Sequence, residues 1–504
     1  MIYTNNSIFK KIAYVFFITF FLTGCFIYSD YGISTDEEVQ RYVIGEANYN
    51  FIKNHNSRAL LANDGKYHGP AFELLLYGAE KMFNVTDERS VYLLRHLLTF
   101  LTFFIASLFF YFLALKIFKY HFAALLCVVM LVVSPRIFAE GFYNSKDLMM
   151  LCFCIISTYT MFLFVERQTV LSALIHSIFC GFTIDIRVMG ILIPIATIYF
   201  YFFQKKKRTI PLIMFLIYLV VFVIVFWPVF WLAPWYHFME ALKQMSKYPG
   251  NGTTLYMGNF VPIQNVPWHY LPVWICITTP LYYIFIFVMG IAYIVKNTLK
   301  NFRSTIPVQL FLFVFASPII AVIVLHSTVY DSWRHVYFVY PFFVLIAVYG
   351  FIQLLQTIKK VIIINSTLTL TFLSIIFTVF FMVRNHPHQN VYFNLLAGSN
   401  IREKYDLDYW GLSYKQGLEY ILTNDSSPKI FITSDHNDMD LTPMLNFSIM
   451  PVKERGRLEY TFDIKSANYF ITNFRWHPKD YNIGTPVHKI DVNGEKIMEV
   501  FKLK

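Results

Sequence analysis

Long apolar runs dominate this chain and alternate with short basic segments. A run of about 18 or more apolar residues is long enough to cross a bilayer as a helix. Hydrophobic residues make up 57% of the 504 residues and charged residues 14%, well below the roughly 25% of soluble domains. We count about eleven runs, of which the fifth and sixth are short: 12–28, 92–115, 121–138, 148–165, 169–184, 188–204, 210–233, 270–295, 306–327, 336–358 and 361–383. The sequence therefore predicts an α-helical polytopic membrane protein.

The basic clusters between the runs predict its orientation. Cytoplasmic loops of membrane proteins are enriched in Lys and Arg. If Lys10 and Lys11 lie in the cytoplasm and the spans alternate, every later cytoplasmic loop is short and basic, as 205–208 illustrates. We therefore expect a multi-pass plasma membrane protein, of the bacterial inner-membrane type, with a cytoplasmic N-terminus. The basic residues that give the net charge of +11 form no single patch, so we expect no nucleic-acid partner.

The segments on the far side are long and chemically mixed. We divide the chain into a membrane domain, 1–384, and a soluble extracytoplasmic domain, 385–504. The second contains β-like runs at 429–433 and 468–472 and a helix-like run at 413–422, which predict a small α/β domain. The membrane domain has four outer loops: 29–91, 134–147, 234–269 and 328–335. Since function usually lies on loops held by a scaffold, we expect the site to face outward.

The six cysteines give no disulfide framework or zinc site in the C-terminal domain, which has none of them. Cys25 ends a Leu-Thr-Gly-Cys stretch that is similar to a lipoprotein cleavage site. We favour the simpler interpretation that it lies in the first membrane helix.

Adjacent carboxylates follow the first predicted span. Asp36 and Glu37 at a membrane edge are suited to activating a hydroxyl or to holding a metal ion. An acidic helix start with Ser34 or Thr35 as its N-cap fits the same pattern equally well.

Charges also recur within the second outer loop. Arg136, Glu140, Lys146 and Asp147 alternate there with aromatic residues. Charges next to membrane spans are costly and usually functional. Arg136 and Lys146 suit a phosphate, whereas Glu140 and Asp147 suit sugar hydroxyls or the orientation of Lys146.

Four more candidates follow: His68 in the first outer loop, Arg95 at the outer end of the second span, and Arg334 and His335 before the tenth span. An exposed loop histidine and a snorkelling arginine are the plainer interpretations of the first two. Outer loops are normally depleted in Lys and Arg, so this excess favours the phosphate of an anionic lipid as a ligand. The tryptophans that flank the third outer loop, among them Trp235 and Trp268, fit an aromatic belt or sugar stacking.

These residues resemble a known family in their order and in their shared side of the membrane. The pattern is similar to that of GT-C membrane glycosyltransferases of the protein O-mannosyltransferase and aminoarabinose-transferase type. The matching blocks are Asp36-Glu37, 66–70, Arg95, 135–147, 267–272, 333–337, 386–394 and 408–411. His68-Gly69-Pro70 departs from the Lys-Pro-Pro run of the aminoarabinose transferases, so the role of His68 does not transfer.

The resemblance implies an inverting transfer of a monosaccharide from a polyprenyl-phosphate carrier to an acceptor on the outer face. It implies that Asp36 is the general base and that Glu37 supports it. The expected donor-phosphate ligands are Arg95, Arg136, Lys146 and Arg334, and the expected substrate ligands are His68, Glu140, Asp147 and His335. The partners are a lipid-linked sugar, a lipid, glycan or protein acceptor, and membrane lipids. No metal ligand is assigned, and a divalent cation stays open as a cofactor.

Two other functions remain as alternatives. A transporter or flippase of lipid-linked saccharides would place polar residues at mid-membrane in both halves, whereas here they lie mainly at the outer edges. A non-catalytic partner in envelope assembly would differ only in lacking transfer activity.

Overall fold

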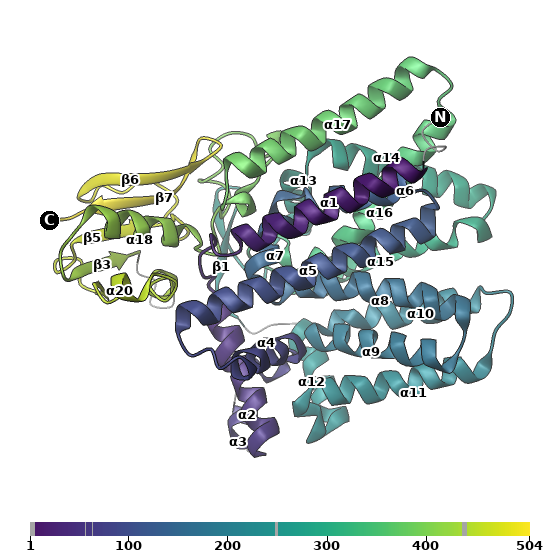
Figure 1. Ribbon diagram of the computed structural model, residues 1–504, viewed down its shortest axis with the longest axis horizontal. Coiled ribbons are helices and arrows are strands. Elements are labelled where there is room, and N and C mark those ends of the chain that lie inside the picture. Colours follow the sequence, from purple (N-terminus) through teal and green to yellow (C-terminus); the bar gives the residue numbers. More distant parts are fainter. Residues whose placement is uncertain (1–5, 56, 63, 247–249, 436–440) are drawn as a thin grey trace.

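The computed structural model describes residues 6–55, 57–62, 64–246, 250–435 and 441–504. In Figure 1 the long helices run side by side, and a small sheet domain lies at one end of the bundle. Within the described residues, eight helices have the length and apolar composition to cross a membrane. They are α1 (Asn6–Ile27), α5 (Glu88–Phe118), α8 (Asp147–Arg167), α11 (Thr209–Phe226), α14 (Leu281–Lys300), α15 (Ile306–Leu325), α16 (Tyr340–Thr357) and α17 (Val361–Arg384).

Further apolar helices complete the bundle. Helices α6 (His121–Val132) and α7 (Pro135–Tyr143) qualify together as one span bent by 68°. Helices α9 (Val170–Ile186) and α10 (Leu192–Phe202) are shorter, as expected for the fifth and sixth runs. Each of the eleven apolar runs is thus helical, which confirms the predicted class of α-helical membrane protein.

Prolines set two boundaries differently from the prediction. The run 270–295 divides into α13 (Tyr270–Thr278) and α14, because Pro280 forces the residue before it into an extended backbone. The segment 134–147, predicted as an outer loop, contains α7 and is buried along its length. Ser134 is extended in front of Pro135, which ends α6 and starts α7 with a proline at its first position.

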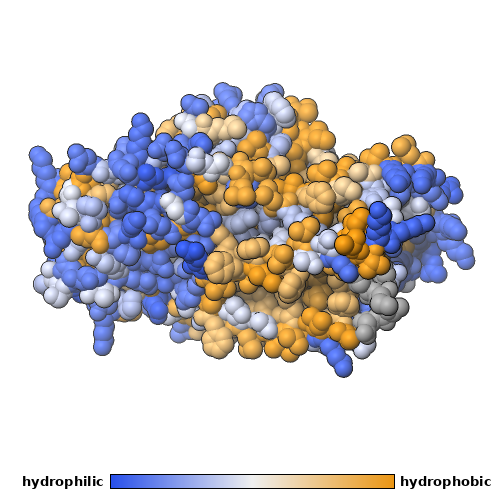
Figure 2. All heavy atoms as spheres, turned by 90° about the horizontal axis from the view of Figure 1, so that it is seen from above, coloured by the Kyte–Doolittle hydropathy of each residue, from blue (hydrophilic) through white to orange (hydrophobic). Residues whose placement is uncertain are grey.

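The bundle has a buried centre and an apolar perimeter. The apolar windows of α8 and α16 are 89% and 83% buried, whereas those of α1, α11 and α17 are 22%, 17% and 22% buried. Figure 2 shows the apolar surface as a band between two hydrophilic ends. Such a band is what lipid contact requires, because hydrocarbon cannot solvate polar groups.

Short elements fold the outer segments over one end of the bundle. The first segment contains a π-helix, η1 (Val39–Glu46), then α2 (Ala47–Asn54), α3 (Ser57–Ala62), η2 (Asp64–Tyr67) and α4 (Ala71–Met82). The third contains α12 (Pro234–Ser246) and a hairpin of β1 (Thr253–Tyr256) and β2 (Asn259–Pro262). Short helical turns occur at η3 (Val188–Ile191), η4 (Pro228–Trp231), η5 (Arg303–Thr305), η6 (Arg334–Val339), η7 (Gln389–Val391) and η8 (Leu395–Ala397).

The C-terminal domain is a five-stranded mixed sheet in the order β4-β3-β5-β7-β6. Strand β3 pairs in parallel with β4 and β5, and β7 pairs antiparallel with β5 and β6. The predicted small α/β domain is confirmed. Its elements are α18 (Ser413–Asn424), β3 (Ile430–Ser434), α19 (Thr442–Leu445), α20 (Val452–Arg455), β4 (Leu458–Tyr460), β5 (Tyr469–Thr472), β6 (Thr485–Val492) and β7 (Glu495–Lys502).

Candidate active site

A cavity of about 270 Å³ lies where the outer segments meet the ends of α8, α15 and η6. Its apolar wall comes from η3, α12 and the C-terminal half of α15. Its polar wall is formed by Asp36, Gln40, His68, Lys146, Arg187, Tyr330, Arg334 and His335. The structure therefore brings together five of the residues predicted from the sequence: Asp36, His68, Lys146, Arg334 and His335. We call this space the active-site cavity.

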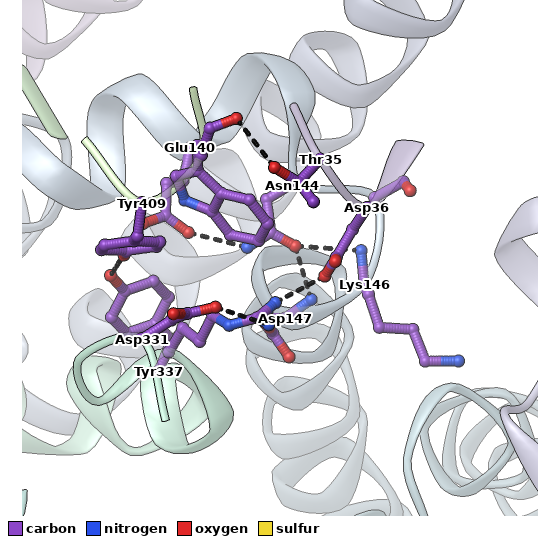
Figure 3. A network of polar contacts seen from close by, with 12 residues as sticks. Thr35, Asp36, Glu140, Asn144, Lys146, Asp147, Asp331, Tyr337 and Tyr409 are labelled. Atoms are coloured by element: carbon purple, nitrogen blue, oxygen red, sulfur yellow. Dashed lines mark hydrogen bonds and ion pairs between the residues drawn. The ribbon is translucent and has the colours of Figure 1, made fainter. Parts of the chain in front are cut away.

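Arg334 is only 4% exposed and pairs with three carboxylates. Figure 3 labels these three residues, Asp36, Asp147 and Asp331. Arg334 Nη1 donates to Asp36 Oδ2 at 2.6 Å and to Asp147 Oδ2 at 3.4 Å, and its Nη2 donates to Asp331 Oδ2 at 3.2 Å. Asp147 also accepts from Arg187, and its side chain is inaccessible to solvent. The Asp36 side chain, in contrast, is 38% exposed. Asp36 is therefore the carboxylate of this cluster that a substrate can reach.

Lys146 and His68 line the same cavity. Lys146 Nζ donates to Gly69 O at 2.8 Å. In Figure 3 the Lys146 side chain extends away from Glu140. Burial, together with the Arg187 guanidinium, lowers the pKa of Lys146 to about 8. Burial and the cations Lys146 and Arg187 lower the pKa of His68 to about 3, so His68 is neutral at physiological pH.

The turn that carries Lys146 is held by a buried polar cluster. Asn144 Oδ1 accepts from the backbone N–H groups of Lys146 and Asp147 at 3.1 and 2.7 Å. Asn144 Nδ2 donates to Glu140 Oε2 at 2.7 Å. Glu140 Oε1 accepts from Tyr337 Oη and Tyr409 Oη at 2.8 and 3.0 Å. Glu140 is fully buried and does not line the cavity, so its observed contacts orient this turn.

Glu37 lies beside the cavity rather than in it. Its Oε2 accepts from Ser34 N at 2.6 Å, and its Oε1 lies 2.9 Å from His96 Nε2. The bond to Ser34 N is of the kind that the acidic residue of a capping box makes, but the Ser34 hydroxyl has no partner among the described residues to complete the box. Glu37 thus links the backbone just before Asp36 to His96 of α5.

Arg95 and Arg136 lie outside the cavity. Arg95 is 2% exposed and pairs with Glu73 and with Glu80, the latter at 3.0 Å. Arg136 is 1% exposed, donates from Nε to the Tyr392 carbonyl at 3.2 Å and stacks on Trp274 and Phe393. The structure therefore separates these two arginines from Lys146 and Arg334.

Sequence patterns missed Arg475, which contacts a residue close to Arg334. Asp331, three positions before Arg334, pairs with that arginine. Arg475 belongs to the C-terminal domain and donates from Nη2 to Asp331 Oδ1 at 2.9 Å and from Nη1 to Tyr409 O at 2.7 Å. Because Asp331 and Arg475 are 144 residues apart, no local sequence pattern indicates that they meet. Arg187, between α9 and η3, pairs with Asp147 and also lines the cavity.

The part of the chain that the structure describes contains no group of three or more His, Cys, Asp or Glu residues arranged to hold a metal ion. Three carboxylates do converge here, Asp36, Asp147 and Asp331, but the Arg334 guanidinium lies between them.

Residues 67–232 match the family described as dolichyl-phosphate-mannose-protein mannosyltransferase. The chain resembles the GT-C glycosyltransferases. The match covers a minority of the 504 residues and includes His68, Lys146 and Arg187 but not Asp36 or Arg334. The resemblance expected from the sequence motifs is thereby confirmed.

Two solved structures of membrane glycosyltransferases are also similar to this chain. One is the oligosaccharyltransferase of Archaeoglobus fulgidus tethered with an acceptor peptide, with a TM-score of 0.47 and 11% identity over 87% of this chain and 61% of that chain. The other is ArnT from Cupriavidus metallidurans bound to undecaprenyl phosphate, with a TM-score of 0.47 and 11% identity over 96% of this chain and 97% of that chain. No curated protein matches the sequence. At this level of similarity neither structure specifies an activity for the chain.

Proposed function

We propose that the chain transfers a monosaccharide from a polyprenyl-phosphate carrier to a hydroxyl group of an acceptor at the extracytoplasmic face of a bacterial inner membrane. The observation that carries the proposal is the active-site cavity. It combines an accessible carboxylate, Asp36, with the cations Lys146, Arg187 and Arg334. A base and an anion-binding wall in one cavity are what transfer from a phosphate leaving group requires.

An apolar groove on α15 supports a lipid-linked donor. The groove is lined by Phe313, Ala316, Ser317, Ile320, Ala321, Val324 and Leu325 and contains no charged residue. It shares Ala321 and Leu325 with the active-site cavity. An isoprenoid tail lying in this groove would bring its phosphate toward the cationic wall, because the groove and the cavity meet at Ala321 and Leu325.

In the proposed reaction Asp36 takes the proton of the acceptor hydroxyl. The oxygen of that hydroxyl bonds at the same time to the anomeric carbon of the sugar. The bond from that carbon to the phosphate oxygen breaks, and polyprenyl phosphate leaves with the negative charge. Lys146 and Arg187 stabilise this charge. Asp147 is buried and neutralised by Arg187 and Arg334, so it is not available as a second nucleophile. A single displacement with inversion of the anomeric carbon follows.

The other candidates take supporting roles in this proposal. His68 and His335 line the cavity, and their ring nitrogens are suited to hydrogen bonds with sugar hydroxyls. Glu37 and Glu140 position the segments that carry Asp36 and Lys146.

The direct test is Asp36→Asn, assayed as release of polyprenyl phosphate from polyprenyl-phosphate hexoses and pentoses by protein in nanodiscs. We expect a loss of about 10²–10⁴-fold, the usual contribution of a general base. Asp30→Asn is the matched control, because Asp30 is a half-exposed carboxylate of the same segment, paired at 2.8 Å with His386 and not lining the cavity. Full activity of Asp36→Asn would refute the role of Asp36. In sealed proteoliposomes, movement of intact donor across the bilayer without cleavage would favour the transporter.

A further inference from the structure

A second cleft adjoins the active-site cavity on the side of the β1–β2 hairpin. Its volume is about 500 Å³, within the range of about 300–1,000 Å³ typical of small-molecule sites. It shares Val322, Ser327 and Val329 with the active-site cavity, so the two spaces have a common wall at the end of α15. The cleft is lined by Gln264, Asn265, Val266, Pro267, Trp268, Tyr270, Leu271, Val322, Ile323, His326, Ser327 and Val329. We call it the Trp268 cleft.

The walls of the Trp268 cleft combine an aromatic face with neutral polar groups. Trp268 is 69% exposed, and its ring meets His269 edge-on at 5.5 Å between centroids. His269 Nδ1 lies 2.6 Å from Tyr256 Oη of β1. This contact holds the imidazole against which the Trp268 ring packs. The described lining contains no Asp, Glu, Lys or Arg, whereas the adjoining active-site cavity is rich in them.

We propose that the Trp268 cleft binds the acceptor and that this acceptor is a neutral saccharide; the inference rests on the proposed function. An exposed indole offers a large apolar face at little conformational cost, and the apolar face of a sugar ring can pack against it. The amides of Gln264 and Asn265 both donate and accept, as neighbouring sugar hydroxyls do. Because the described lining contains no Lys or Arg, it gives an anionic acceptor no permanent counter-charge.

Because the Trp268 cleft and the active-site cavity share lining residues, an acceptor bound in the cleft lies next to the reacting atoms. A saccharide stacked on Trp268 can extend its terminal residue past Ser327 into the active-site cavity, where Asp36 is accessible. The donor would reach the same cavity from the α15 groove, which adjoins it through Ala321 and Leu325. The two substrates would therefore approach Asp36 from different sides of the end of α15, without competing for one entrance.

The main rival explanation of Trp268 is an interfacial anchor, and the chain supplies a matched control. Trp235 on α12 is 75% exposed and does not line the Trp268 cleft. Loss of an anchor should have similar consequences at both positions, whereas loss of an acceptor contact should be confined to Trp268.

The experiment compares wild type, Trp268→Ala, Trp268→Tyr and Trp235→Ala in nanodiscs. The donor is the polyprenyl-phosphate sugar that the wild type cleaves. The acceptor probes are chitotriose and maltotriose as neutral saccharides, an oligogalacturonide as an acidic one, and a Ser-rich peptide. For Trp268→Ala we expect the KM for a neutral saccharide to rise about fivefold to tenfold, while the donor KM is unchanged. Trp268→Tyr should recover part of this loss, and Trp235→Ala should behave as wild type.

Each result decides between the proposals. A wild type that releases no polyprenyl phosphate from any donor contradicts the proposed function itself. A wild type that cleaves donor but glycosylates the peptide, the acidic saccharide or none of the neutral saccharides overturns the acceptor inference alone. Equal effects of Trp268→Ala and Trp235→Ala, or a changed donor KM with an unchanged acceptor KM, also overturn it.

Discussion

Arg475 connects the C-terminal domain to the candidate active site, and its replacement by Gln tests that connection. The guanidinium bridges Asp331 Oδ1 and the Tyr409 carbonyl. Asp331 in turn accepts from Arg334, which holds Asp36. Arg475→Gln removes one of the two guanidinium groups that pair with Asp331 and leaves the other, that of Arg334.

The size of the effect follows from burial. The side chains of Arg475 and Asp331 are 13% and 8% exposed, so solvent screens the pair only partly. A hydrogen bond to a charged group contributes about 1.5–3 kcal/mol, and complete loss of one partner of a buried pair costs about 3–5 kcal/mol. Because Asp331 keeps Arg334, we expect about 2–3 kcal/mol of lost stability. A stronger pull of Asp331 on Arg334 weakens the Arg334–Asp36 contact. If about half of that free energy is also lost from the stabilisation of the transition state, kcat falls about tenfold.

The assay pairs thermal unfolding in nanodiscs with donor turnover. Arg402→Gln is the control, because the Arg402 side chain is also 13% exposed, pairs at 2.9 Å with Asp480 and stacks on Phe474 within the C-terminal domain. We expect Arg475→Gln to lower kcat while Arg402→Gln does not. In the double variant with Asp331→Asn, the effect of Arg475→Gln should largely disappear. Wild-type kcat in Arg475→Gln, or equal losses in both arginine variants, would refute the reasoning.

Two further predictions concern the remaining cations. Burial and Arg187 lower the pKa of Lys146 to about 8, so its ammonium is present below that pH and lost above it. The donor KM should therefore rise as the pH increases through about 8. A flat profile of donor KM between about pH 6.5 and 9.5 would exclude Lys146 as a phosphate ligand. Arg95→Met should lower the free energy of unfolding by about 3–5 kcal/mol, because it leaves buried Glu73 without its cation, while Glu80 keeps Arg41. A stable variant with a raised donor KM would show that Arg95 binds the donor instead.

The membrane architecture was predictable because it depends on local composition. A span needs only enough consecutive apolar residues, and each run that we identified forms a helix. The prediction was weaker where one proline redirects the chain. Pro135 turns an expected loop into the buried helix α7, and Pro280 separates α13 from α14. Both breaks follow from the restriction that a proline places on the preceding residue, which hydrophobicity does not register.

Much of the candidate site could not be predicted, because charge alone does not show which groups remain available to a ligand. Arg136 and Lys146 belong to one motif, yet α7 places Arg136 against Trp274 while the turn after α7 directs Lys146 into the cavity. Glu140 looks like a ligand in the sequence, but two tyrosines and Asn144 already occupy its oxygens.

The same reasoning separates Asp36, which the sequence already singled out, from the other carboxylates around Arg334. Of the carboxylates that meet Arg334, Asp147 and Asp331 are each held by a second arginine, and their side chains are 0% and 8% exposed. Asp36 is 38% exposed, and Arg334 is its ion-pair partner. A carboxylate that keeps lone pairs free can accept a proton during a reaction, whereas one that is saturated by two guanidinium groups can only orient them. Arginines from three distant segments, at 187, 334 and 475, therefore leave Asp36 as the accessible carboxylate of this cluster, which supports its proposed role as the base.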